Sequence, residues 1–342
     1  MNEKLLYLQS WFVSKYINLI GNKNAPFSNI LIIKLDEIGD LVTSLHVFKN
    51  IHKLYPSAKI TLFCKSFNNL FFKHIEYVSC VNNEIPKDID CDLIIDLRGD
   101  LSTLKYALKT KPKYRLDRGT IRLKNKFFGG QKNELHTNLQ VIEPINTIPK
   151  ILDNSITLSN QDTKTVDCFI KEENIGDFVI MHLGARDETR RWPVERFAAC
   201  INYINNTYNL ACVLVGGPED HQLNIDCLEL VKSKRNVNVV GLFNLLEFAA
   251  LCSRARLFLG NESGPLHIAS AQNTPLIALF GPGVKEVFYP LGENVKIHHY
   301  FLSRGHKHQT MENTTIVNIT IDEVKASIDF LLNKKARDRI SG

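Results

Sequence analysis

The sequence lacks any long hydrophobic run. No stretch of its 342 residues reaches the ~18 uninterrupted apolar residues that indicate a transmembrane helix. The amino terminus is also unlike a secretion signal, because Glu3 and Lys4 precede a broken apolar run with no small-residue cleavage site. These two absences predict a cytoplasmic protein.

Paired cysteines are absent as well. The eight cysteines are scattered along the chain and none forms a C-x-x-C pair, so the sequence supports neither a disulfide framework nor a zinc site. Most of them lie within apolar stretches. We therefore expect buried free thiols in a reducing compartment.

Acidic residues are scarce in one segment. Residues 105–126 contain nine Lys and Arg residues, with only Asp117 against them, and contribute much of the net charge of +6. Such a run is either a solvated face or a surface for a polyanion, namely a phosphorylated glycolipid or a membrane. No helix-turn-helix, RNA-recognition or zinc-finger pattern accompanies it, so we do not expect nucleic acid as a partner. The candidates for binding such a polyanion in this segment are Arg115, Arg118 and Arg122.

The length favours two domains, since one hydrophobic core rarely supports so long a chain. We predict a first domain over residues 1–155, a second over residues 156–320, and a terminal helix over residues 321–342 that crosses back to the first. Apolar residues at helical spacing predict an amphipathic helix within residues 1–25. It either packs on its own domain or attaches to a membrane interface.

Strands and helices alternate in both halves. Aliphatic runs typical of buried parallel strands alternate with helical patterns, which predicts an α/β fold of two Rossmann-like, doubly wound domains. The expected strands are residues 30–35, 60–64, 93–97, 178–183, 211–215, 237–240, 257–259 and 276–280. The expected helices include residues 41–54, 194–205, 245–252 and 265–271.

The first strand runs into a short turn that holds three carboxylates. Asp36 and Glu37 follow the strand directly, and Asp40 follows Gly39 at the head of the next helix. An aspartate there is either a helix N-cap or a catalytic base, and Asp36 and Glu37 are competing bases. Arg98 and Asp100 follow the strand at residues 93–97, so they are expected at the same carboxyl edge of the sheet as Asp36 and Glu37.

Two turns in the second half suit a diphosphate. Gly184 and Ala185 follow a strand and lead into a loop with Arg186 and Arg190, so exposed amides and guanidinium groups can bind anionic oxygens together. Further along, Glu262, Ser263 and Gly264 precede a helix. Pro265 stands at its favoured first turn, and His267 lies close behind it. For the first turn the alternative is an arginine-rich surface loop without a ligand. For the second, the alternative is that His267 has only a structural role.

Four segments together resemble glycosyltransferase family 9, the lipopolysaccharide heptosyltransferase family. They are I-K-L-D-E-I-G-D, H-L-G-A-R-D-E-T-R-R-W-P, V-L-V-G-G-P-E-D and G-N-E-S-G-P-L-H-I-A-S, in the family's order between residues 30 and 285. The resemblance implies a GT-B architecture, with two domains facing across a cleft, the acceptor on the first and the nucleotide-sugar on the second. The acceptor-binding candidates on the first domain are then Asp36, Arg98, Asp100, Arg115, Arg118 and Arg122.

The resemblance also implies roles for single residues. Asp40 matches the proposed catalytic base, and Arg190 matches a diphosphate-binding residue that is lysine in other members. Glu262, Ser263 and Gly264 match an Asp-Ser/Thr-Gly turn, with His267 at the family's histidine. Asp220 matches a contact to the donor's ribose, and Phe243 falls near the position that packs on the base.

The implied reaction is inverting transfer without a metal. By the same resemblance, the donor is expected to be ADP-heptose, which is a substrate and not a cofactor. The expected acceptor is a lipopolysaccharide core or a related envelope glycan. The protein is expected either free in the cytoplasm or in peripheral contact with the cytoplasmic face of the inner membrane. Asp90 and Asp92 spell a D-x-D metal motif by chance, and His298, His299, His306 and His308 lack ligand spacing. Alternatives are another nucleotide-sugar donor, or a catalytically silent binding or scaffold protein.

Overall fold

A computed structural model divides the chain into two compact units, residues 1–157 and 158–342. It describes residues 3–82, 89–129, 133–145, 147–281, 285–300 and 315–340. His306 and His308 lie outside these ranges. No helix among the described residues is long and apolar enough to cross a membrane.

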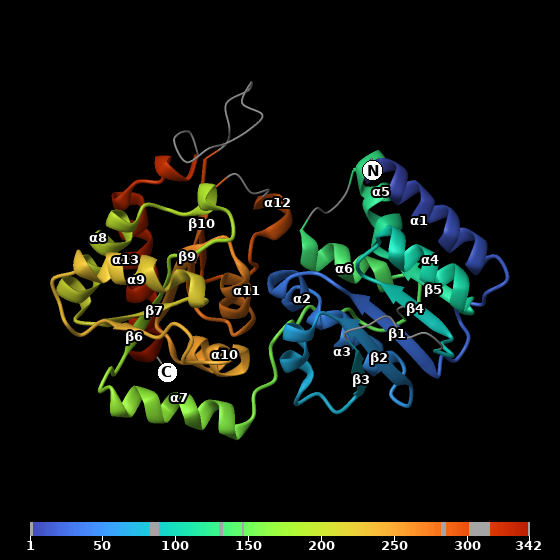
Figure 1. The fold of residues 1–342 in the computed structure, drawn as a ribbon, viewed down its shortest axis with the longest axis horizontal. Coiled ribbons are helices and arrows are strands. Elements are labelled where there is room, and N and C mark those ends of the chain that lie inside the picture. Colours follow the sequence, from blue (N-terminus) through green and yellow to red (C-terminus); the bar gives the residue numbers. More distant parts are fainter. Residues whose placement is uncertain are drawn as a thin grey trace. The chain divides into compact units, whose positions relative to one another are not determined.

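The first unit is built on a parallel five-stranded sheet with helices around it (Figure 1). The strand order β3-β2-β1-β4-β5 reverses direction between β1 and β4. The strands are β1 (Asn29–Lys34), β2 (Lys59–Cys64), β3 (Val78–Asn82), β4 (Leu93–Asp96) and β5 (Tyr114–Asp117). The helices are α1 (Glu3–Asn18), α2 (Ile38–Val42), α3 (Leu45–Leu54), η1 (Ser66–Phe72), α4 (Leu101–Thr110), α5 (Arg118–Phe128) and α6 (Glu134–Ile142).

The aliphatic runs of this unit form its central strands, as the sequence predicts. Residues Ile30 to Ile33 of β1 are fully buried because both faces of the parallel sheet are covered. The single helix predicted over residues 41–54 is wrong, since the chain breaks it into α2 and α3. At the break, the Thr43 and Ser44 hydroxyls donate to backbone carbonyls of α2, which competes with continuing the helix.

The second unit repeats the design with a parallel six-stranded sheet of order β11-β10-β9-β6-β7-β8, which reverses between β9 and β6. Its strands are β6 (Phe178–His182), β7 (Ala211–Val215), β8 (Val237–Asn238), β9 (Leu257–Asn261), β10 (Leu276–Phe280) and β11 (Val295–His299). Its helices are α7 (Asn160–Glu172), η2 (Glu188–Arg190), α8 (Val194–Tyr208), η3 (Pro218–Asp220), α9 (His221–Glu229), α10 (Leu245–Arg254), α11 (Gly264–Ala271), α12 (Lys285–Phe288), η4 (Thr315–Asn318) and α13 (Ile321–Ile340).

The terminal helix α13 is part of the second unit's core. Val324, Ile328, Leu331 and Leu332 are buried in one cluster with residues of α8, β6, β7, β9 and β10. The sequence suggested a return to the first domain for this helix. Its buried apolar residues instead belong to the second unit.

Candidate functional site

Each sheet has a switch point where a ligand site is expected. In an open parallel sheet, ligands bind beyond the carboxyl ends of the strands, at the point where strand order reverses. In the first unit this point lies at the ends of β1 and β4, which lead to Asp36 and Arg98. In the second it lies at the ends of β6 and β9, which lead to Gly184 and Glu262.

Asp36 is the centre of a buried ion network at the first switch point. Its Oδ2 lies 2.9 Å from Lys34 Nζ and 3.4 Å from Arg118 Nη1, and Arg98 Nη1 donates to its Oδ1. Burial alone would raise the pKa of Asp36, but Lys34, Arg118 and Arg98 outweigh it and hold the pKa well below its ordinary range. Asp36 therefore stays ionised and anchors three cations.

A second carboxylate extends this network. Glu134, at the start of α6, is buried, with its Oε1 3.0 Å from Arg118 Nε and its Oε2 3.2 Å from Arg122 Nη2. Arg118 also donates to the Leu97 carbonyl at 2.8 Å. The buried Arg118 thus connects two carboxylates, whereas the half-buried Arg122 lies at the edge.

Asp40 lies beside this network without joining it. No hydrogen bond or ion pair between described residues engages its carboxylate, and its predicted alternative role as N-cap is wrong because Glu37 holds that position of α2. Burial raises the pKa of Asp40 above its ordinary value, although the nearby charge of Lys34 opposes the rise. An unpaired carboxylate with a raised pKa has the properties of a general base.

The other acceptor-side candidates differ in accessibility. Arg98 is substantially exposed, and its Nε lies 3.3 Å from Asp100. Asp100 is the N-cap of α4 and accepts from the amides of Ser102 and Thr103, so its carboxylate is occupied by a structural role. Arg98 is the candidate here that can most easily reach a ligand.

The prediction that Arg115 binds an acceptor is wrong. Arg115 is fully buried at β5, with its Nη2 2.7 Å from Asp96 Oδ2 and its Nη1 3.2 Å from Asp117 Oδ2. The basic run of residues 105–126 is therefore not one surface. It contains the buried strand β5, which sequence patterning missed because two of its four residues are charged.

In the second unit, the turn after β6 is packed closely against η3, which follows β7. A Cβ on Gly184 would lie 2.2 Å from Asp220 Oδ1, so only glycine fits there. Asp220 Oδ2 accepts from the Gly217 amide at 3.0 Å and lies 3.7 Å from His182 Nε2. Because Asp220 is buried in these contacts, the geometry gives it a role in supporting the turns and does not favour the predicted ribose contact.

The arginine loop places Arg190 beside Glu262. Arg190 Nη1 lies 3.6 Å from Glu262 Oε1, and the Arg190 side chain is partly exposed while Glu262 is buried. Burial raises the pKa of Glu262, and the charge of Arg190 opposes it. The structure thus brings together two of the predicted donor residues. In the same loop, Arg191 Nε donates to the Ala185 carbonyl at 3.0 Å, and Arg186 is exposed.

The start of α11 has no side-chain cap. Ser263 is its N-cap residue, but the Ser263 hydroxyl lies 3.2 Å from His182 Nδ1 and donates to the Asn261 carbonyl, leaving the first helix amides without a side-chain acceptor. Gly264 and Pro265 begin the helix. Uncapped amides at a helix N-terminus favour an anion such as phosphate.

Two predicted donor residues lie farther into the unit. His267 is buried and burial lowers its pKa to about 4, so it is neutral at physiological pH and can donate from one ring nitrogen only. Phe243 precedes α10 and packs edge-on against Phe169 of α7, with ring centroids 5.1 Å apart. It is half-buried, which leaves part of its surface open.

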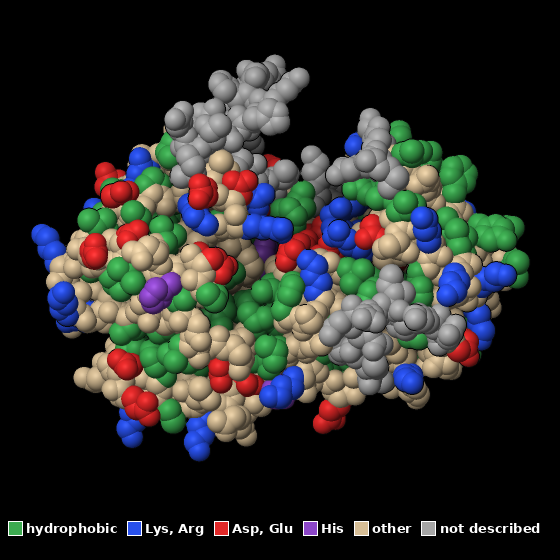
Figure 2. Space-filling view, viewed as in Figure 1, with side chains coloured by type: hydrophobic (Ala, Val, Ile, Leu, Met, Phe, Trp, Pro, Cys, Tyr) green, Lys and Arg blue, Asp and Glu red, His purple; other side chains and the backbone are tan. Residues whose placement is uncertain are grey.

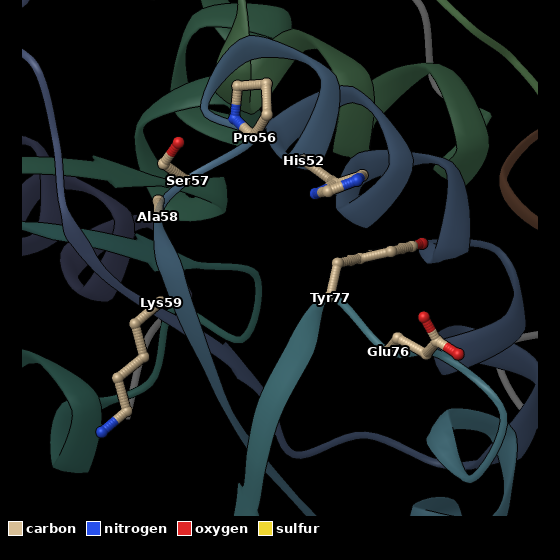
Figure 3. A pocket seen from close by; sticks show the side chains of 7 residues that line it. All are labelled: His52, Pro56, Ser57, Ala58, Lys59, Glu76 and Tyr77. Atoms are coloured by element: carbon tan, nitrogen blue, oxygen red, sulfur yellow. The ribbon is translucent and has the colours of Figure 1, made fainter.

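A surface pocket elsewhere has a different character. It is lined by His52, Tyr77 and residues around the start of β2 (Figure 3). The rings of His52 and Tyr77 are stacked, with their centroids 4.3 Å apart. This is the amino end of the strand, the edge opposite the ion network. The pocket is therefore not part of the candidate site.

Metal ligands do not cluster in the part of the chain that the structure describes, where no group of three or more His, Cys, Asp or Glu residues could hold an ion. Asp92 accepts from the amides of Ser28 and Asn29 and pairs with Lys113, so it joins β4 to the start of β1. His298 lies 3.0 Å from the Ser327 hydroxyl.

Sequence reasoning missed several residues of these sites. Lys34 is fully buried at the end of β1, and a lysine closing the run Ile30 to Ile33 was the available signal. Glu134 gave no signal along the chain, and His182 opens a segment that resembles the family but was given no role, because the partners of both residues are distant in sequence.

The fold is of the GT-B type, which it shares with solved glycosyltransferase structures. The family 9 glycosyltransferase structure from Veillonella parvula matches with a TM-score of 0.76 and 17% identity, over 92% of this chain and 100% of that one. The E. coli ADP-heptose lipopolysaccharide heptosyltransferase II matches with a TM-score of 0.71 and 18% identity, over 90% and 99%.

The sequence then gives the family. The family's sequence profile matches residues 91–317, and the chain belongs to glycosyltransferase family 9 (heptosyltransferase). It is 24% identical to the lipopolysaccharide core heptosyltransferase OpsX of Haemophilus influenzae over 283 residues, which cover 75% of this chain and 79% of the relative. With lipopolysaccharide heptosyltransferase 3 of Escherichia coli it shares 29% identity over 154 residues, 44% of each.

Proposed function

We propose that this glycosyltransferase is inverting and metal-independent, and that it transfers heptose from ADP-heptose to a lipopolysaccharide core or related envelope glycan in the cytoplasm. The relative OpsX is a lipopolysaccharide core heptosyltransferase by name. A structure of similar fold, the E. coli heptosyltransferase WaaC, holds ADP-2-deoxy-2-fluoro heptose. These relatives support both the donor and the acceptor class.

The observation that carries the proposal is the contrast between Asp36 and Asp40. Asp36 is held ionised by three cations and has little tendency to take a proton. Asp40 has no partner among the described residues, and its raised pKa makes it the stronger base. We assign Asp40 to deprotonate the acceptor hydroxyl as the hydroxyl oxygen attacks the anomeric carbon, opposite the departing diphosphate.

The second unit offers two kinds of stabilisation for the diphosphate. The uncapped amides at the start of α11 present N–H donors together with the positive end of the helix. Arg190 adds a guanidinium whose pairing with Glu262, at 3.6 Å, is long enough to be exchanged for phosphate oxygens. Growing negative charge on the leaving group can thus be stabilised by groups of the chain itself.

The acceptor contacts follow from exposure. Arg98 is the accessible cation of the Asp36 network, and Arg122 lies at the network's edge, so these two can reach anionic groups of an acceptor. Arg118 is buried, and we assign it to hold Asp36 and Glu134 in place.

The test is an assay of the purified chain with ADP-heptose and, separately, with UDP-hexoses, in the presence of core glycan acceptor. We expect transfer from ADP-heptose, with NMR showing an inverted anomeric configuration in the product. Transfer from a UDP-sugar alone would reassign the donor. Tight nucleotide-sugar binding with neither transfer nor hydrolysis would indicate a silent binding protein, and a retained anomeric configuration would overturn the role of Asp40.

A further inference from the structure

The helix α1 packs on the protein with one side of mixed polarity and exposes a second, apolar side to solvent. On the inner side Ser10 and Ser14 are buried, and Leu6, Val13 and Ile17 are half-buried, with Ile17 packed against an apolar cluster of the first unit. The Ser10 and Ser14 hydroxyls donate to the two carboxylate oxygens of Asp117, each at 2.5 Å. Arg115 Nη1 donates to the Ser14 hydroxyl at 2.6 Å. A surface helix ordinarily exposes a polar side, so the second, solvent-facing apolar side of α1 departs from the usual pattern.

The solvent-facing side of α1 is a stripe of large apolar residues. Leu5, Leu8, Phe12 and Tyr16 recur at intervals of three and four residues, which places them on one side of the helix. All four are exposed, Phe12 by 57% and Tyr16 by 72%. Continuous exposed apolar surface of this kind marks an interaction site.

The helix α5 adds to the same surface. It packs against α1, and a Cβ on its Gly119 would lie 2.8 Å from the Ser10 side chain, so the two helices are in close contact (Figure 1). Its last two residues, Phe127 and Phe128, are 70% and 84% exposed. Figure 2 shows hydrophobic side chains gathered at this edge of the first unit, with Lys and Arg between them.

The exposed charged side chains that the structure describes on α1, α4 and α5 are all basic. The sequences of α4 and α5 contain no Asp or Glu, and Lys105, Lys109, Lys124 and Lys126 are exposed on them. Lys15 is exposed on α1. Two copies of this surface would oppose like charges, whereas an anionic bilayer attracts lysines and accepts Phe and Leu at its headgroup level.

We propose that α1 and the end of α5 dock this protein on an anionic phospholipid surface, with the apolar stripe entering the headgroup region and the lysines contacting lipid phosphates. The proposal rests on the proposed function in one respect, since a lipid-linked acceptor would be presented at such a surface. The docking itself requires neither donor nor acceptor.

The experiment is cosedimentation of the full chain with vesicles of phosphatidylcholine and phosphatidylglycerol, and with phosphatidylcholine alone. We expect binding to the anionic vesicles that weakens as salt rises, because surface charges are screened. Phe127→Ser combined with Phe128→Ser should reduce the partition coefficient about tenfold or more. Lys124→Glu with Lys126→Glu should reduce it about fivefold or more per residue.

The matched control is Leu230→Ser with Leu242→Ser, two exposed leucines of the second unit, which should leave vesicle binding unchanged. Circular dichroism checks that every variant is folded. The proposal is overturned if the wild-type chain stays in the supernatant with anionic vesicles, or if the control lowers binding as much as the Phe127 and Phe128 variant. Loss of a dimer in light scattering with the same Phe substitutions, without vesicle binding, would assign the surface to a second copy. Transfer to a soluble acceptor fragment, measured separately, tests the proposed function without this surface.

Discussion

Replacing Asp40 by asparagine should reduce turnover while leaving the fold and donor affinity nearly unchanged. Loss of a positioned general base typically costs ~10²–10⁴ in rate, which corresponds to about 2.7–5.5 kcal/mol of transition-state stabilisation. Because no described residue bonds the Asp40 carboxylate, the amide leaves no broken ion pair behind. The assay compares kcat at saturating donor with ADP-heptose affinity from calorimetry.

Two neighbouring carboxylates serve as comparisons. Glu37→Gln should stay within a few fold of wild type, since Glu37 is exposed and pairs with Lys65 at the surface. Asp36→Asn should lower activity together with stability, because it removes a partner of the buried Lys34. Breaking a buried ion pair typically lowers the free energy of unfolding by about 3–5 kcal/mol, a change large enough to be measured by urea titration. Turnover near wild type in Asp40→Asn would refute our reasoning and direct attention to Asp36.

The pH dependence gives an independent check on Asp40. Burial raises the pKa of Asp40 above 3.8, so kcat/KM should increase with pH through a value higher than that of an ordinary aspartate. The positive charge of Lys34 lowers the pKa of Asp40. Lys34→Met should therefore move the acidic limb of the profile to higher pH, whereas Lys65→Met should not. An unmoved limb in Lys34→Met, with the protein folded, would exclude Asp40 as the titrating group.

Three further predictions concern the rest of the site and the core. Arg190→Ala should weaken ADP-heptose binding and slow transfer, since removing a hydrogen bond to a charged group costs roughly 1.5–3 kcal/mol; Glu262→Gln should preserve binding, and unchanged ADP affinity in calorimetry with Arg190→Ala would make Arg190 a surface residue. Transfer should survive EDTA, and complete loss that magnesium restores would contradict the metal-independent mechanism. Arg115→Met should lower the free energy of unfolding by about 3–5 kcal/mol, because it leaves Asp96 and Asp117 buried without their cation; a urea midpoint equal to wild type would contradict this stabilising role of Arg115.

The sequence by itself determined the central strands of the two parallel sheets and the turns that lead to the candidate sites. Aliphatic runs such as Ile30 to Ile33 specify buried strands because both faces of a parallel sheet must be covered. The glycine, acidic and hydroxyl residues that follow β1, β6 and β9 mark the carboxyl ends where a site can form. Periodicity and turn chemistry are local properties, so they can be read along the chain.

Only the tertiary structure decided which charged residues are accessible and which are paired. Arg115 and Arg98 are both arginines after or within a strand, yet one is fully buried between Asp96 and Asp117 and the other is exposed. Asp36 and Asp40 differ in the same way, since three cations from separate elements surround one and no described partner meets the other. Pairing and desolvation depend on neighbours that are distant in sequence, and these neighbours decide which carboxylate can act as a base.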